Sequence, residues 1–218
     1  MERKIKCAVF DLDGTLVNTI DDLGNACNTL LKKHGYGYHW TESDYKRFVG
    51  NGAKKLVERA FGGKLSEDEL DNIYAEFKEL YNRTMLDNAY AYDGIKEQLD
   101  ILKANGIKLC VVTNKPNAAA IGMVEHIFGD GYFDSINGVI DGKPTKPDPY
   151  STLLALETVG CSADEAIYFG DSNVDMQTAK NAQIEAVGVT WGFRSFEELF
   201  AEHPSLIIDD PKYISKLI

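Results

Sequence analysis

The sequence predicts an α/β protein in which a Rossmann-like doubly wound parallel sheet carries an inserted all-helical domain. Short apolar runs rich in β-branched and aromatic residues alternate with helical segments after residue 92, and this alternation is typical of parallel strands joined by right-handed crossovers. Between the first apolar run and this region, apolar residues follow helical spacing only. We therefore expect an α/β core formed by residues 1–16 and 90–218, with a helical insert over residues 17–89.

The first strand is predicted over residues 5–10, a largely apolar run (IKCAVF) that ends at Asp11. The insert is predicted to be helical throughout because its apolar residues recur at three- and four-residue spacing. Two of its helices begin after N-cap residues, Thr41 and Ser66. The predicted helices cover residues 21–34, a short segment after Thr41, residues 53–61, and a long segment after Ser66.

The second part of the core is predicted to alternate between helix and strand. Strands are predicted at residues 107–112, 135–140, 166–170, 185–190 and 206–208, and helices at residues 95–104, 117–128 and 150–159. The carboxyl ends of parallel strands meet at one edge of a sheet, where open α/β sheets bind their ligands. Side chains directly after these strands are therefore the candidates for a functional site.

The composition of the 218-residue chain is that of a globular protein, with 44% hydrophobic and 26% charged residues. No apolar run is long enough to span a bilayer, and the segment MERKIKCAVF lacks the apolar region of a signal peptide, so we expect a cytoplasmic protein. The four cysteines are far apart in the sequence and show no metal-type spacing, which predicts reduced structural thiols.

The partner class is limited by charge. A formal net charge of −11 disfavours nucleic acid and anionic membranes, because no global field attracts phosphate polymers. A small anionic molecule can still bind where the site itself is positive. Exposed apolar strands are not evident in the sequence, so we expect a monomer or a weak homo-oligomer.

Two carboxylates follow the first predicted strand. Alternate side chains of an extended backbone share a face, so Asp11 and Asp13 are expected to project together, and Gly14 allows a sharp turn or a close ligand. The simplest alternative is a solvated turn. An EF-hand loop is excluded because Leu16 occupies the position of its invariant glycine and a strand precedes. An aspartic protease would need the order Asp-Thr-Gly, whereas this chain has Asp-Gly-Thr.

Further polar residues follow the later strands. Each has an ordinary explanation alone, such as helix capping or a solvated loop charge. Together they bring carboxylates, a hydroxyl, an amide and an ammonium group to one edge of the sheet. Such a set of groups can bind a metal ion and a phosphoryl group. These residues are Thr113, Asn114, Lys146, Asp171 and Asp175.

These residues lie in four motifs, FDLDGT, VVTN, KP and GDSNVD, and with them the chain resembles the haloacid dehalogenase superfamily. The helical insert resembles the small α-helical cap of that superfamily. Within it, VGNG in the insert and KPDPY around Lys146 are similar to phosphoglycolate phosphatases. The chain departs from the common pattern at Asn18, Thr19 and Asp93, none of which carries chemistry.

The resemblance implies a Mg²⁺-dependent phosphatase that acts on a small phosphorylated metabolite. It implies that Asp11 is a nucleophile forming an aspartyl-phosphate, and that Asp13 is the general acid and base. The residues expected to assist catalysis are Thr113 and Lys146, those expected to hold the metal are Asp11, Asp13 and Asp171, and Asp175 is expected behind them. Phosphate or substrate contacts are expected from Leu12, Asn114, Gly50, Asn51 and Gly52.

Several alternatives stay open at this stage. A pyrophosphatase, a nucleotidase and a sugar phosphomutase would share the fold and the Asp11 chemistry. A catalytically inactive binding module would share the fold alone. A response-regulator receiver domain is disfavoured, because it needs adjacent acids after the first strand and a shorter chain. The VGNG segment also has a simple structural explanation, a turn between two helices.

Overall fold

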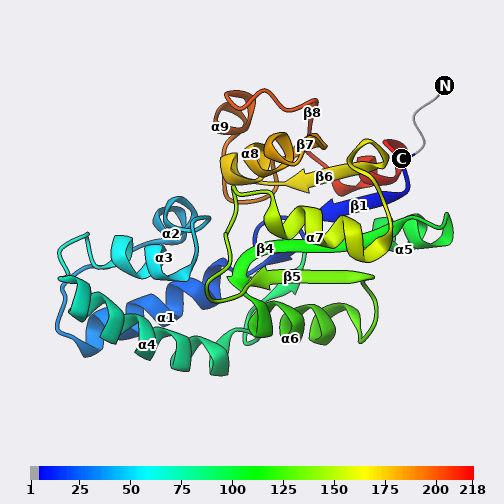
Figure 1. Ribbon diagram of the computed structural model, residues 1–218. Coiled ribbons are helices and arrows are strands. Elements are labelled where there is room, and N and C mark those ends of the chain that lie inside the picture. The colour runs from blue at the N-terminus through cyan, green and yellow to red at the C-terminus, as the bar shows by residue number, and fades with distance from the viewer. Residues whose placement is uncertain (1–4) are drawn as a thin grey trace. The chain divides into compact units, whose positions relative to one another are not determined.

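The computed structural model describes residues 5–218. Its core contains a six-stranded sheet of order β5-β4-β1-β6-β7-β8, and every neighbouring pair is parallel (Figure 1). The expected α/β class is therefore confirmed. The strands are β1 (Cys7–Phe10), β4 (Lys108–Pro116), β5 (Ser135–Val139), β6 (Ala166–Gly170), β7 (Glu185–Val189) and β8 (Leu206–Ile208).

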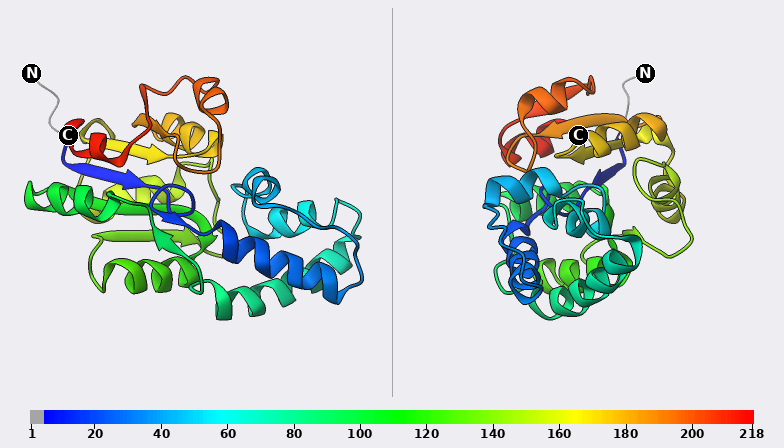
Figure 2. Two further views of the ribbon diagram at one scale, coloured as in Figure 1. Left: turned by 180° about the vertical axis from the view of Figure 1, so that it is seen from behind. Right: turned by 90° about the vertical axis from the view of Figure 1, so that its left-hand side faces the viewer.

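Helices cover both faces of this sheet. Helix α7 (Tyr150–Val159) lies in front of the sheet in Figure 1, whereas α5 (Ile95–Ala104) lies in front of it when the molecule is turned by 180° (Figure 2). The other core helices are α6 (Asn117–Phe128), α8 (Asn173–Asn181) and α9 (Phe196–Phe200), with the 3₁₀ turns η1 (Ala163–Glu165) and η2 (Pro211–Lys216). None of the helices in residues 5–218 is long and apolar enough to cross a membrane.

Strand β1 is central because all four of its side chains are apolar and buried. Cys7 and Val9 pack on the face covered by α7 and α8, within a cluster that includes Leu156 and Met176. Such burial on both faces is typical of an inner parallel strand. It fixes where the strand ends, and hence where Asp11 begins the loop that follows.

Strand β4 is longer than the predicted segment 107–112. It continues to Pro116, where it pairs with Val139 of β5 after a shift in register beyond Val112. The sequence places Thr113, Asn114 and Lys115 at the end of this strand, and the structure includes all three in it. They lie between the pairs Val112–Asn137 and Pro116–Val139, across the shift in register.

Contacts divide the chain into two compact units, one formed by residues 1–17 and 91–218 and the other by residues 18–90. The second unit is helical, as its apolar spacing predicts, and Ser66 caps its longest helix, as expected, in a capping box with Glu69. Its helices are α1 (Ile20–Lys33), α2 (Glu42–Phe48), α3 (Ala53–Ala60) and α4 (Glu67–Thr84). Where the chain passes between the units, β2 (Val17–Asn18) pairs with β3 (Tyr90–Ala91).

Candidate active site

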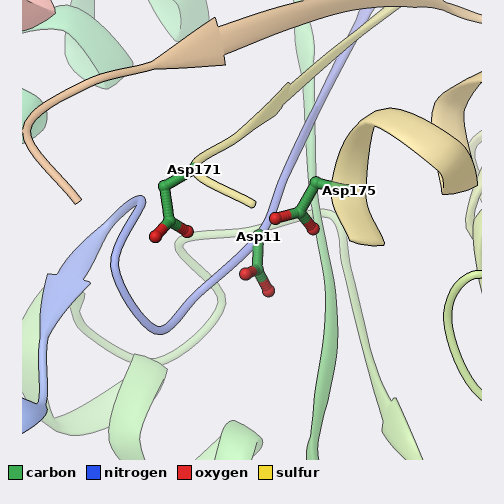
Figure 3. Close-up of side chains that lie close together, drawn as sticks. All are labelled: Asp11, Asp171 and Asp175. Carbon is green, nitrogen blue, oxygen red and sulfur yellow. The ribbon is translucent and has the colours of Figure 1, made fainter. Parts of the chain in front are cut away.

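Three buried carboxylates meet at the carboxyl edge of the sheet. Asp11 follows β1, Asp171 follows β6, and Asp175 lies in the first turn of α8. Carboxylate oxygens of the three lie within 4.8 Å of one another, and Figure 3 shows the groups gathered at the ends of these elements. The backbone N–H of Asp11 donates to the carbonyl of Phe169 at 3.0 Å, which ties the first loop to β6.

The loop after β1 turns sharply at Gly14. This glycine has φ +94°, and a Cβ atom built on it would lie 2.4 Å from Asp171 Oδ2. The carbonyl of Leu12 accepts hydrogen bonds from the N–H groups of Thr15, Leu16 and Val17 and so closes the turn. Glycine is required here for both its backbone conformation and its lack of a side chain.

Lys146 joins two of the carboxylates. Its buried Nζ lies 2.7 Å from Asp11 Oδ1 and 2.7 Å from Asp175 Oδ1. The carboxamide of Asn114 accepts from the Lys146 backbone N–H at 2.9 Å and donates to its carbonyl at 3.1 Å. The side chain of Asn114 thus holds the loop that carries Lys146, whereas the phosphate contact predicted for this residue stays a prediction.

Asp175 is saturated with hydrogen bonds. Its Oδ2 accepts from the backbone N–H of Ser172 at 3.0 Å and from the hydroxyl at 2.6 Å, forming the capping box of α8. Its Oδ1 accepts from Lys146 and, at 3.3 Å, from the Tyr168 hydroxyl. Asp175 therefore fixes the ammonium group of Lys146 and the start of α8 together.

Asp171 is held by a segment that sequence reasoning missed. Its Oδ1 accepts from the Thr15 hydroxyl at 3.1 Å, and its Oδ2 accepts from the Phe193 N–H at 2.8 Å. Trp191 Nε1 donates to the Thr15 carbonyl at 3.0 Å. A Cβ atom on Gly192 would lie 2.3 Å from Asp171 Cβ, so only glycine fits. A glycine between two aromatic residues just after a buried strand was the available signal.

Lys115 was also missed. Its side chain is buried, and its Nζ lies 2.9 Å from Asp13 Oδ1. Its backbone N–H donates to the hydroxyl oxygen of Thr113, itself buried, at 3.2 Å. Thr113 and Lys115 are two residues apart on one strand, the spacing that places side chains on the same face of regular extended backbone. That spacing was the signal in the sequence.

The electrostatics of the cluster follow from burial. Burial and the neighbouring Asp175 raise the pKa of Asp171 to about 7. Burial and Asp175 also hold the pKa of Asp11 well above its usual range, against the opposing effect of Lys146. Burial alone would lower the pKa of Lys146, but Asp11 and Asp175 outweigh it and raise that pKa. The ammonium group of Lys146 therefore stays charged, but one positive charge does not neutralise the three surrounding carboxyl groups.

The donor set fits a hard divalent cation. Asp11 and Asp171 offer oxygen atoms only, which are the ligands that such cations prefer. Asp11 Oδ1 is buried and has no aligned hydrogen-bond donor, although Lys146 Nζ lies near it. A cation among these groups would lower the raised pKa values of both carboxyls and supply the missing charge.

The other predicted site residues lie in the helical unit. Gly50, Asn51 and Gly52 directly precede α3, and both glycines have positive φ. Asn51 Oδ1 accepts from the Arg59 guanidinium at 2.8 Å. Two lysines at the start of α3 are paired inside this unit, Lys54 with Asp71 and Lys55 with Glu58. These residues and the core residues thus belong to different units of the chain.

Comparisons with known proteins point to one family. The model of the family described as haloacid dehalogenase-like hydrolase matches residues 8–189. A phosphoglycolate phosphatase of Pseudomonas putida is 31% identical over 94% of this chain and 76% of its own length. One of Agrobacterium fabrum is 34% identical over 97% and 93%. The crystal structure of a predicted phosphoglycolate phosphatase from Haemophilus somnus has 30% identity and a TM-score of 0.91, over 100% of this chain and 99% of that one.

Proposed function

Because the chain belongs to the haloacid dehalogenase-like hydrolases and is a phosphatase of that family, we propose that it is a Mg²⁺-dependent phosphoglycolate phosphatase working through an aspartyl-phosphate. The observation that carries the proposal is the buried contact of Lys146 with Asp11, beside the carboxylate of Asp171. A small phosphorylated metabolite is the substrate class, and we propose a cytoplasmic location and a monomer or weak homo-oligomer.

Asp11 is the nucleophile. Phosphate monoesters react extremely slowly in water, so the enzyme must place a nucleophile in line and neutralise the phosphoryl oxygens. A carboxylate oxygen of Asp11 forms the new bond to phosphorus while the bond to the leaving oxygen breaks. Lys146 offsets the negative charge of Asp11 and of the phosphoryl group, and the Thr113 hydroxyl and the Leu12 and Asn114 backbone line the same edge.

Asp13 moves the protons. In the first step its carboxyl group gives a proton to the departing oxygen, so that an alcohol leaves. In the second step its carboxylate takes a proton from water as the water oxygen attacks phosphorus and the bond to Asp11 breaks. Inorganic phosphate leaves and Asp11 is restored as a carboxylate.

Asp11, Asp171 and the backbone carbonyl of Asp13 would hold Mg²⁺. Asp175 would not contact the ion and instead pairs with Lys146. When bound, the ion neutralises charge on the phosphoryl oxygens. Lys146 favours the ionised, nucleophilic form of Asp11, because a nearby positive charge favours a carboxylate over a carboxylic acid, and a bound cation would act in the same direction.

The leaving group is recognised by the helical unit. The core residues named above all contact the phosphoryl group or the metal in this proposal, so selectivity for the leaving group must come from other residues. We propose that Gly50, Asn51 and Gly52 bind a small acidic leaving group through backbone N–H groups at the start of α3, where the helix dipole favours an anion.

The test is Mg²⁺-dependent release of phosphate from a panel containing phosphoglycolate, pyrophosphate, a nucleoside monophosphate and a sugar phosphate. We expect the highest kcat/KM with phosphoglycolate and no release in excess chelator. A higher kcat/KM with another compound of the panel would make that compound the substrate in place of phosphoglycolate. Persistence of the aspartyl-phosphate until a phosphorylated sugar intermediate rebinds would indicate a mutase, and full activity without divalent metal would refute the site.

A further inference from the structure

We propose that Lys115 is a positioning residue that holds the carboxylate of Asp13 for proton transfer, an inference that rests on the proposed function. The ammonium group donates to Asp13 Oδ1 at 2.9 Å, and the two side chains are 3% and 14% exposed. Both residues lie in the α/β unit. The pair is therefore a buried interaction within the core and not a surface contact.

The burial of Lys115 is itself informative. An ammonium group taken out of water is strongly unfavourable unless an anion and aligned hydrogen bonds compensate for it. Lys108, on the same strand, shows the ordinary arrangement: it pairs with Asp134 at 2.7 Å while its own side chain is 51% exposed. Lys115 instead reaches inward to the acidic loop after β1.

Strand β4 helps to place one lysine beside Asp11 and another beside Asp13. Asn114, which directly precedes Lys115 on the strand, binds the backbone of Lys146. Lys146 in turn contacts Asp11, and Lys115 contacts Asp13. The proposed nucleophile Asp11 and the proposed acid and base Asp13 thus each contact a lysine. The consecutive residues Asn114 and Lys115 of β4 place these two contacts, Asn114 by holding Lys146 and Lys115 directly.

A hydrogen bond to Oδ1 fixes the orientation of the Asp13 side chain. The other carboxylate oxygen, Oδ2, is then the one that exchanges the proton. In hydrolysis of the aspartyl-phosphate, the proton passes from water to Asp13, the water oxygen bonds to phosphorus, and the bond between phosphorus and Asp11 breaks. Lys115 keeps its protons throughout, so its contribution is geometric.

The test is a double-mutant cycle between Lys115→Met and Asp13→Asn, with acetyl phosphate and 4-nitrophenyl phosphate as substrates. Removing the lysine should lower kcat by about 10- to 100-fold, the usual loss when a supporting contact to a reacting group is removed. Acid-quenched samples should contain more aspartyl-phosphate than wild type, because the hydrolysis step slows. In the Asp13→Asn background the same change should have little further effect, since residues that act through one another are not additive.

The matched control is Lys108→Met, which removes a lysine from the same strand and should leave kcat unchanged. If Lys115→Met does not fold, Lys115→Gln, which is shorter and uncharged but polar, takes its place in the cycle. Equal fold losses in the wild-type and Asp13→Asn backgrounds, or an unchanged kcat, would overturn the positioning role. A wild-type protein without phosphatase activity, or an Asp13→Asn variant with full activity, would instead overturn the proposed function.

Discussion

Replacing Gly192 by alanine tests whether the segment after β7 positions Asp171. The added Cβ would lie 2.3 Å from Asp171 Cβ and 2.3 Å from the Gly14 carbonyl oxygen. Unbonded carbon atoms pack at about 3.5 to 4.0 Å, so one of these groups must move by about 1 Å. Rotation of a side chain cannot relieve the contact, because a Cβ atom and a backbone oxygen move only with the main chain.

The expected loss follows from that displacement. A shift of about 1 Å at a reacting centre costs about 100-fold in rate, and overpacking costs about 1 to 3 kcal/mol of unfolding free energy. We therefore expect Gly192→Ala to remain folded, to lose about 100-fold in kcat/KM, and to need more Mg²⁺ for half-maximal activity. The measurements are phosphate release over a Mg²⁺ titration and thermal unfolding in chelator.

Gly188→Ala is the control, because Gly188 lies on β7 and its added Cβ would be 3.4 Å from the flexible side chains of Ile207 and Leu199. This variant should retain wild-type kinetics. If Gly192→Ala kept the wild-type kcat/KM and Mg²⁺ requirement while folded, Gly192 would not support Asp171. Equal losses in both variants would point to a general effect on β7.

Three further predictions concern Asp11, the titration of Asp171 and the VGNG segment. Asp11→Asn should fold, and its kcat should fall by about 10⁴-fold or more, because an amide cannot attack phosphorus. The assay is phosphate release, and substantial remaining activity would contradict the assignment of Asp11 as nucleophile. The pKa of Asp171 is raised from 3.8 to about 7, so the unfolding free energy of the metal-free protein should fall as pH rises between these values. Mg²⁺ should therefore raise Tm more at pH 8 than at pH 6. An equal increase of Tm at the two pH values would refute this prediction. Asn51→Ala should lower turnover of phosphoglycolate far more than that of acetyl phosphate, whereas equal losses would make the VGNG segment structural.

The fold and most of the core site could be predicted because strand ends are visible in sequence. Asp11 and Asp171 each follow a short run of apolar residues, and parallel strands bring such positions to one edge. Lys146 lies in a loop without periodicity, and it was singled out because it follows the strand predicted at residues 135–140. Its position depends on contacts with Asn114, 32 residues earlier in the chain, which no local pattern reveals.

Lys115 and Gly192 were missed for a different physical reason. A lysine at the end of a strand is expected to be solvated, and its burial becomes apparent only when the partner Asp13 is seen. Gly192 follows β7 and has no side chain, so its role is the space that it leaves for Asp171. Both roles are set by a second segment far away in the sequence.

The acidity of the protein does not prevent the site from binding a phosphate dianion. A net charge of −11 acts over long distances, where salt screens charges beyond about 8 Å at physiological ionic strength. Two unit charges about 4 Å apart near a protein surface interact by about 4 kcal/mol, and the buried position of Lys146 shields it from salt. The short-range charges of Lys146 and of a bound cation therefore decide the affinity for phosphate. The overall charge only slows the approach of the anion from solution.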